Sequence, residues 1–170
     1  MKELLIMAKS LGGGGSEVAL IELINALPEE AYNITLVLLD SDNEYEETLK
    51  KLVATYNLEE QFVFLGRKDN PYSYMKNCDL YVQPSRHEGY GLTIVEARVL
   101  GLPIVVSNIR PLAEQIQDGV NGYVAELSAE AMADKIEYLY SNPSQMEKTV
   151  EYLKEHPIDF SAELQKLETI

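Results

Sequence analysis

The sequence predicts an α/β protein, a single doubly wound Rossmann-like domain with about six mostly parallel strands and a helical C-terminal tail. Short runs rich in Val, Ile, Leu, Tyr and Phe recur between amphipathic stretches, as expected when helices cover both faces of a parallel sheet. The chain has 170 residues, of which 46% are hydrophobic, so one domain with a buried core is expected. No repeat or linker divides residues 1–170.

Each expected strand is a continuous apolar run, typical of strands that are buried on both faces. The strands are expected at residues 3–8, 34–39, 61–65, 80–83, 104–106 and 122–124. The helices between them are expected at residues 16–27, 44–56, 72–77, 92–100 and 111–117. The tail continues as helices at 130–140 after Ser128, at 144–155 and at 160–167, with Pro143 and Pro157 at helix boundaries.

The charge of the chain limits its partners. A net charge of −14 opposes attraction to nucleic acid or to an anionic membrane surface, so no nucleic-acid partner is expected. Residues 61–125 nevertheless hold 6 basic and 6 acidic side chains and all four arginines, so an anionic ligand is expected there unless this clustering is due to chance. No apolar run suits a membrane helix or a secretory signal, which predicts a cytoplasmic location.

The segment 84–96 runs from a strand end through a glycine-containing turn into a helix. Gly89 and Gly91 let the backbone approach a ligand closely, and a helix that begins near Gly91 presents N–H groups that suit a diphosphate. Glu96 lies about one turn further along, where a carboxylate can accept hydrogen bonds from ribose hydroxyls. Glu88 precedes the turn and can bind sugar hydroxyls. Taken alone, the two carboxylates are also consistent with solvated charges near a helix N-terminus.

Four stretches around this segment carry a family resemblance. They are Asn-Pro-Tyr-Ser-Tyr-Met-Lys-Asn-Cys-Asp-Leu at 70–80, Glu-Ala-Arg-Val-Leu-Gly-Leu-Pro-Ile-Val at 96–105, Glu-Gln-Ile at 114–116 and Asp-Gly-Val-Asn-Gly-Tyr-Val at 118–124. Over about residues 42–150 the chain resembles the donor-binding domain of family 4 glycosyltransferases, which are retaining enzymes of the GT-B fold. The resemblance implies transfer of a sugar from a nucleoside-diphosphate sugar with retention of configuration, without a metal or another cofactor.

The resemblance also assigns roles to residues. The family has two glutamates with seven residues between them, and the matching residues here are Glu88 and Glu96. It implies that Glu88, the catalytic candidate, lies near the donor sugar and that Glu96 binds the ribose. The backbone next to the sugar and diphosphate would belong to Gly89, Tyr90, Gly91 and Leu92.

Two basic residues outside this segment are further donor-binding candidates. Arg67 follows the third expected strand, close to where the family binds the base, although a solvated surface charge is an equal interpretation. Lys9 follows the first strand, where the family has an Arg and a Lys that clamp the diphosphate. The glycines at 12–15 can offer N–H groups to phosphate or form a flexible linker. We also expect Arg86 or Lys9 to face the same crevice as Glu88 and offset its charge.

Residues 1–40 resemble a different part of the same family, the start of the acceptor domain. Donor-type sequence begins directly after them, as an internal deletion would produce, and one βαβ unit would then replace another in the sheet. The resulting hypothesis is a donor-binding module that takes its acceptor surface from a second chain or copy. The alternatives are a non-catalytic nucleotide or nucleotide-sugar binding protein, an inactive remnant, and an α/β interaction module without a ligand.

Overall fold

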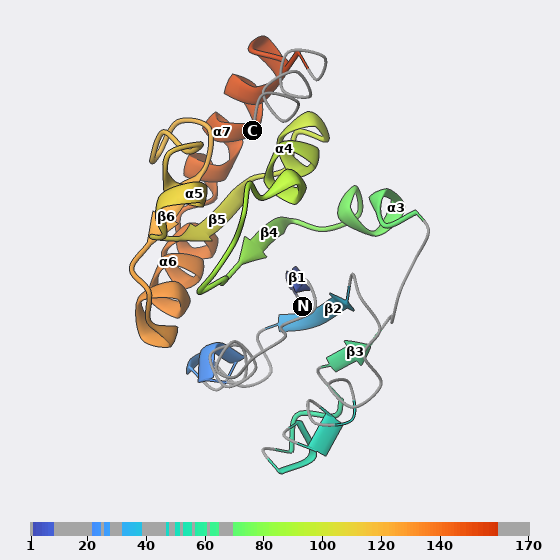
Figure 1. Ribbon diagram of the computed structural model, residues 1–170. Coiled ribbons are helices and arrows are strands. Elements are labelled where there is room, and N and C mark those ends of the chain that lie inside the picture. The colour runs from blue at the N-terminus through green and yellow to red at the C-terminus, as the bar shows by residue number, and fades with distance from the viewer. Residues whose placement is uncertain are drawn as a thin grey trace.

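A computed structural model shows helices packed on a parallel sheet, which confirms the predicted α/β class (Figure 1). The structure describes residues 2–8, 22–24, 26–27, 32–38, 47, 50–51, 53–55, 57–60, 62–64 and 70–159. The helices expected at 16–27 and 44–56 lie only partly within these ranges, and helical residues occur at 22–24 and 53–55. The helix expected at 160–167 lies outside the described residues.

Six strands form the sheet in the described part of the chain, in the order β3-β2-β1-β4-β5-β6, and all neighbouring pairs are parallel. The strands are β1 Lys2–Ala8, β2 Tyr32–Leu38, β3 Phe62–Phe64, β4 Leu80–Gln83, β5 Ile104–Ser107 and β6 Tyr123–Ala125. Each overlaps an expected strand, with ends that differ by at most two residues. Continuous apolar runs therefore located the strands correctly.

Strand β1 lies in the middle of the sheet. Its residue Leu4 pairs with Ile34 of β2 on one side and with Leu80 of β4 on the other. The two strands within residues 1–40 thus belong to the same sheet as the later strands. The strand order reverses between β1 and β4, and in doubly wound sheets ligands bind at the carboxyl ends of the strands at this switch point.

Five helices have described bounds: α3 Tyr72–Met75, α4 Leu92–Val99, α5 Arg110–Ala113, α6 Ala129–Ser141 and α7 Pro143–Glu155. Helices α3 and α5 end earlier than expected, because the chain tightens into turns. The N–H groups of Asn77 and Ile116 bond to carbonyls three residues back, those of Tyr74 and Ala113. Ser128 begins α6 as expected, since its hydroxyl accepts the N–H of Ala131 at 3.1 Å.

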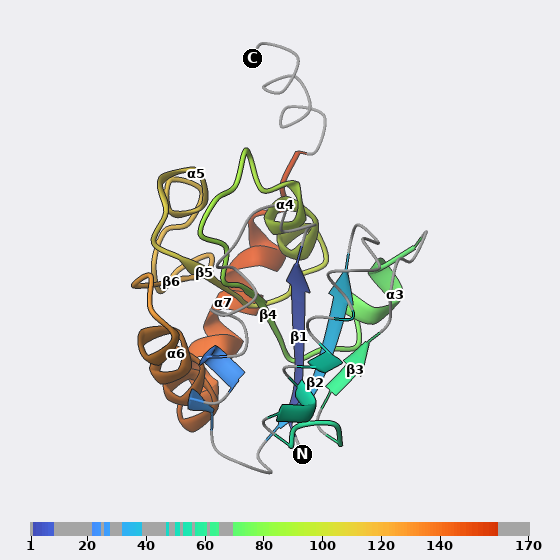
Figure 2. The same ribbon diagram turned by 60° about the horizontal axis from the view of Figure 1, so that its bottom comes forward.

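Strand β4 divides its side chains between two apolar cores, one on each face of the sheet. Leu80 and Val82 belong to the core that includes the helical residues at 22–24 and α6, whereas Tyr81 belongs to the core under α4 and α5. Both views place the residues at 22–24 next to α6 (Figures 1 and 2). Gln83 follows this alternation, so its side chain shares the face of Tyr81 at the carboxyl end of the strand.

Candidate functional site

The candidate site is the loop that joins β4 to α4, at the switch point of the sheet. Gly91 begins α4 with φ +76° and ψ 52°, a left-handed conformation that glycine adopts without a steric penalty. A Cβ atom on Gly91 would lie 2.8 Å from Cδ2 of the buried Leu112. Among the described side chains none caps α4, so the helix dipole favours an anion at this end.

A buried glutamine connects the strand to Glu88. The side chain of Gln83 is only 3% exposed, and its Nε2 donates to Oε2 of Glu88 at 2.9 Å. Its Oε1 accepts the hydroxyls of Tyr81 and Thr93, each at 2.9 Å. The other oxygen of Glu88 accepts the N–H of Gly89 at 3.0 Å. Glu88 is therefore held by both oxygens at the start of the turn.

Two further side chains hold the loop through its backbone carbonyls. Gln115 Nε2 donates to the carbonyl of Tyr90 and, at 2.7 Å, to that of Pro111. Ser107, at the end of β5, donates its hydroxyl to the carbonyl of Ser85. Because a trans peptide points its C=O and N–H in opposite directions, the bond from Gln115 turns the N–H of Gly91 away from α5. The loop is thus fixed by neighbours on both the strand and the helix side.

Glu96 lies on the second turn of α4 and is partly buried. Its Oε1 accepts the hydroxyl of Tyr72 at 3.1 Å. Burial raises the pKa of Glu96, and the hydrogen bond from Tyr72 lowers it by less. The charge of Glu96 in turn raises the pKa of Tyr72, which keeps that hydroxyl a donor. Glu96 is therefore a partly buried carboxylate that accepts a hydrogen bond within the protein. The alternative interpretation was a solvated surface charge.

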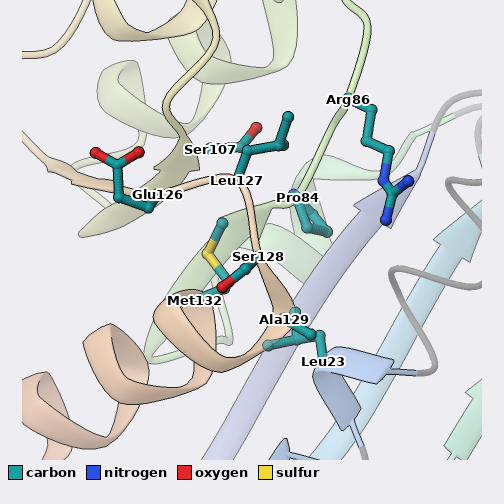
Figure 3. Close-up of a pocket in the computed structure, with 9 residues that line it drawn as sticks. All are labelled: Leu23, Pro84, Arg86, Ser107, Glu126, Leu127, Ser128, Ala129 and Met132. Atoms are coloured by element: carbon teal, nitrogen blue, oxygen red, sulfur yellow. The ribbon is translucent and has the colours of Figure 1, made fainter.

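The loop also borders a small hollow on the other face of the sheet (Figure 3). Its walls come from the loop after β4, the end of β5, the start of α6 and the helical turn at 22–24, and are formed by Leu23, Pro84, Arg86, Ser107, Glu126, Leu127, Ser128, Ala129 and Met132. Arg86 lies on the rim and points its guanidinium group away from Glu126 (Figure 3). That Arg86 or Lys9 faces the crevice of Glu88 stays a prediction.

The structure brings most of the expected site residues together in one segment. Glu88, Gly89, Tyr90, Gly91, Leu92 and Glu96 follow β4 in an unbroken loop and helix. Lys9 and Arg67 lie outside the described residues, as do the glycines at 12–15.

Three polar residues of the site were missed by the sequence analysis. Gln83 carried a weak signal, because it is a polar residue that ends an apolar strand directly before the site. Tyr72 is 24 positions from Glu96, and Gln115 is 25 positions from Tyr90, so only the fold brings these pairs into contact. No sequence spacing predicts either contact.

The described ranges hold no group of three or more His, Cys, Asp or Glu side chains gathered in a way that would bind a metal ion. None of the helices in this part of the chain combines the length and apolar character that crossing a membrane requires.

The parallel sheet, with a loop at its switch point that leads into the uncapped start of α4, defines a Rossmann-like domain. The model of the family glycosyl transferases group 1 matches residues 5–156. The chain therefore belongs to this glycosyltransferase family.

Individual relatives agree with this assignment. The uncharacterized glycosyltransferase MJ1178 of Methanocaldococcus jannaschii is 31% identical over 144 residues, covering 83% of this chain and 40% of the relative. The first three curated relatives are matched over 40%, 19% and 31% of their length, so the chain spans less than half of each.

Solved structures show the same fold. Anabaena Alr3699/HepE in complex with UDP and glucose has a TM-score of 0.78 at 22% identity, over 89% of this chain and 42% of that one. The C-terminal domain of the group 1 family protein LpcC from Francisella tularensis has a TM-score of 0.75 at 21% identity, over 89% of this chain and 82% of that domain. The described fold thus corresponds to about half of the first protein and to most of an isolated domain of the second.

Proposed function

We propose that this chain is the donor-binding module of a retaining glycosyltransferase, which takes a sugar from a nucleoside-diphosphate sugar. The observation that carries the proposal is the order of groups along one segment at the switch point: Glu88, the uncapped start of α4, and then Glu96. The resemblance of about residues 42–150 to a donor-binding domain supports it, and so does UDP bound to a protein of this fold.

Each part of the segment suits one part of such a donor. The start of α4 would bind the diphosphate through backbone N–H groups at its positive end. Glu96 lies one turn further on, about 6 Å along the helix axis from Leu92, so its carboxylate would accept the ribose hydroxyls. Glu88, on the other side of the turn, would accept hydroxyls of the sugar. The three contacts require no metal ion from the protein.

The remaining parts of the enzyme belong to the proposal as well. Lys9 would contact the diphosphate and Arg67 the base, in a protein that we place in the cytoplasm. The acceptor surface would come from outside the donor module, either from a second chain or from another copy. Residues 1–40 would be the start of an acceptor domain that supplies the first βαβ unit of this sheet.

Calorimetric titration tests the proposal directly. The chain is titrated with UDP, GDP and ADP, and then with UDP-glucose, GDP-mannose and ADP-glucose. We expect one base to bind, with a dissociation constant in the micromolar range typical of binding near −8 kcal/mol, and we expect the matching sugar donor to bind too. Absence of binding by all six compounds would refute a working donor site.

One observation favours a second function, that of a nucleotide-sugar binding protein without transferase activity. The sequence directly after β1, at residues 9–15, contains Lys9 and glycines but no arginine for the leaving diphosphate. Such a protein would bind the donor and release no nucleoside diphosphate from it, whereas a transferase would release it when supplied with an acceptor domain. Measuring nucleoside diphosphate release from the donor that binds best distinguishes the two.

A further inference from the structure

Gln83 is a buried polar side chain of the site. It lies at the last position of β4, is 3% exposed, and makes three side-chain hydrogen bonds at 2.9 Å. A buried polar group that loses such a partner costs about 1–3 kcal/mol, so the three contacts of Gln83 matter for the stability of the site. Its partners are Tyr81, Thr93 and Glu88, of which only Glu88 belongs to the proposed donor contacts.

The orientation of the Gln83 amide follows from its bond to Glu88. A carboxylate only accepts hydrogen bonds, so the amide nitrogen of Gln83 must face Glu88 and its Oε1 must face the other way. The hydroxyls of Tyr81 and Thr93 both donate to this Oε1. Tyr81 is fully buried, and burial raises the pKa of its phenol, so the hydroxyl keeps its proton. One amide therefore joins Glu88 to a hydroxyl of the strand and a hydroxyl of α4.

We propose that Gln83 is a positioning residue that sets the carboxylate of Glu88 toward the donor sugar and ties it to the first turn of α4. The inference rests on the proposed function, because it assigns Glu88 to the sugar. Thr93 lies one residue after Leu92, so the same amide joins the sugar contact to the helix start that would hold the diphosphate. A shift of α4 would move Glu88 with it through this amide.

Nuclear magnetic resonance tests the contact without any ligand. In the wild-type chain the side-chain NH₂ of Gln83 is expected to exchange slowly with solvent, because it is buried and bonded to a carboxylate. Its signals are assigned from their loss in Gln83→Glu. In Glu88→Ala they should shift and exchange faster. Identical Gln83 amide signals in the wild type and in Glu88→Ala would overturn the proposal.

Binding measurements test what the contact does. Gln83→Glu keeps the shape of the side chain but replaces the donor by an oxygen that faces Glu88. We expect it to weaken binding of UDP-glucose, or of the sugar donor that binds best, by about tenfold, and to change binding of the matching free nucleotide less than about twofold. Gln117→Glu, at an exposed position after α5, is the matched control and should change neither. Equal losses for nucleotide and sugar donor would mean a merely structural role and would overturn the proposal.

Two further variants cover the case in which Gln83→Glu does not fold. Tyr81→Phe removes one hydroxyl that donates to Oε1 and holds the amide in place, and should reproduce the selective loss of sugar binding in weaker form. The double variant Gln83→Glu with Glu88→Gln restores an amide beside a carboxylate, so it should recover the melting temperature while sugar binding stays weak. A double variant that is no more stable than Gln83→Glu would contradict the contact. If the wild type binds no nucleotide, the proposed function fails, and the amide signals alone decide whether Gln83 holds Glu88.

Discussion

Replacing Glu96 by glutamine separates the ribose contact from packing. Oε1 of Glu96 already accepts the hydroxyl of Tyr72 at 3.1 Å, and the amide oxygen of a glutamine can keep this bond. The second oxygen becomes an NH₂ group, which cannot accept a ribose hydroxyl. The variant therefore loses one charge-assisted hydrogen bond of about 1.5–3 kcal/mol, which corresponds to a loss of about tenfold to a hundredfold in nucleotide affinity.

The stability of the fold should hardly change in Glu96→Gln. Burial already disfavours the charged form of Glu96, and the neutral amide retains the shape and the bond from Tyr72. We expect the free energy of unfolding to stay within about 0.5 kcal/mol of the wild type. Thermal melts measure this change alongside calorimetry with the best-binding nucleoside diphosphate. Glu155→Gln, at the exposed end of α7, is the matched control and should change neither quantity.

Two results would refute this reasoning in different ways. Equal nucleotide affinity in the wild type and Glu96→Gln would remove the ribose assignment. A fall of several degrees in the melting temperature, together with weaker binding, would show that Glu96 serves mainly the packing of Tyr72 against α4.

Two further predictions concern backbone strain and pH. Gly91 combines a positive φ with a crowded Cβ position, Gly101 has the positive φ with open space, and Gly89 has neither. Chemical denaturation of the alanine variants should therefore show that the free energy of unfolding falls by about 3 kcal/mol for Gly91, about 1 kcal/mol for Gly101 and less than about 0.5 kcal/mol for Gly89. Equal losses in the three variants would contradict this order. The pKa of Glu96 is raised above its ordinary value of 4.5. Nucleotide affinity should therefore fall on acidification, with a midpoint above pH 4.5, because protonated Glu96 no longer accepts the ribose hydroxyls. The free energy of unfolding should decrease as pH rises through the same midpoint, because the folded protein favours the protonated form. Tyr72→Phe removes a donor that lowers this pKa, so calorimetry across pH should find a higher midpoint, and an unchanged one would argue against the contact.

Features that local rules decide could be predicted from the sequence. Continuous apolar runs located the strands, and the cap at Ser128 and the glycine at Gly91 located the starts of α6 and α4. The fold class and the segment with the candidate site followed from these features. Assignment to the glycosyltransferase family, which the family match confirms, needed the resemblance in addition.

Contacts that join distant residues could not be predicted from the sequence. The end of α5 depends on bonds three residues back, such as that from Ile116 to Ala113, which helical periodicity does not reveal. The role of Gln83 depends on an amide that Tyr81, Thr93 and Glu88 hold together in space. Such contacts become visible only when the strand and the helix are placed against each other.

Strand β1 lies in the middle of the sheet, where two parts of the chain meet. The ladder between β1 and β4 pairs Leu4 with Leu80, which are 76 positions apart (80 − 4), and joins the three strands β3, β2 and β1 to the three strands β4, β5 and β6. Closing so long a loop is slow, so the two parts are expected to meet late in folding. A chain cut between β3 and α3 would then give two fragments that assemble by pairing β1 with β4. A ligand bound across the carboxyl ends of these two strands would hold the fragments together, so their association would serve as a sensor of the ligand.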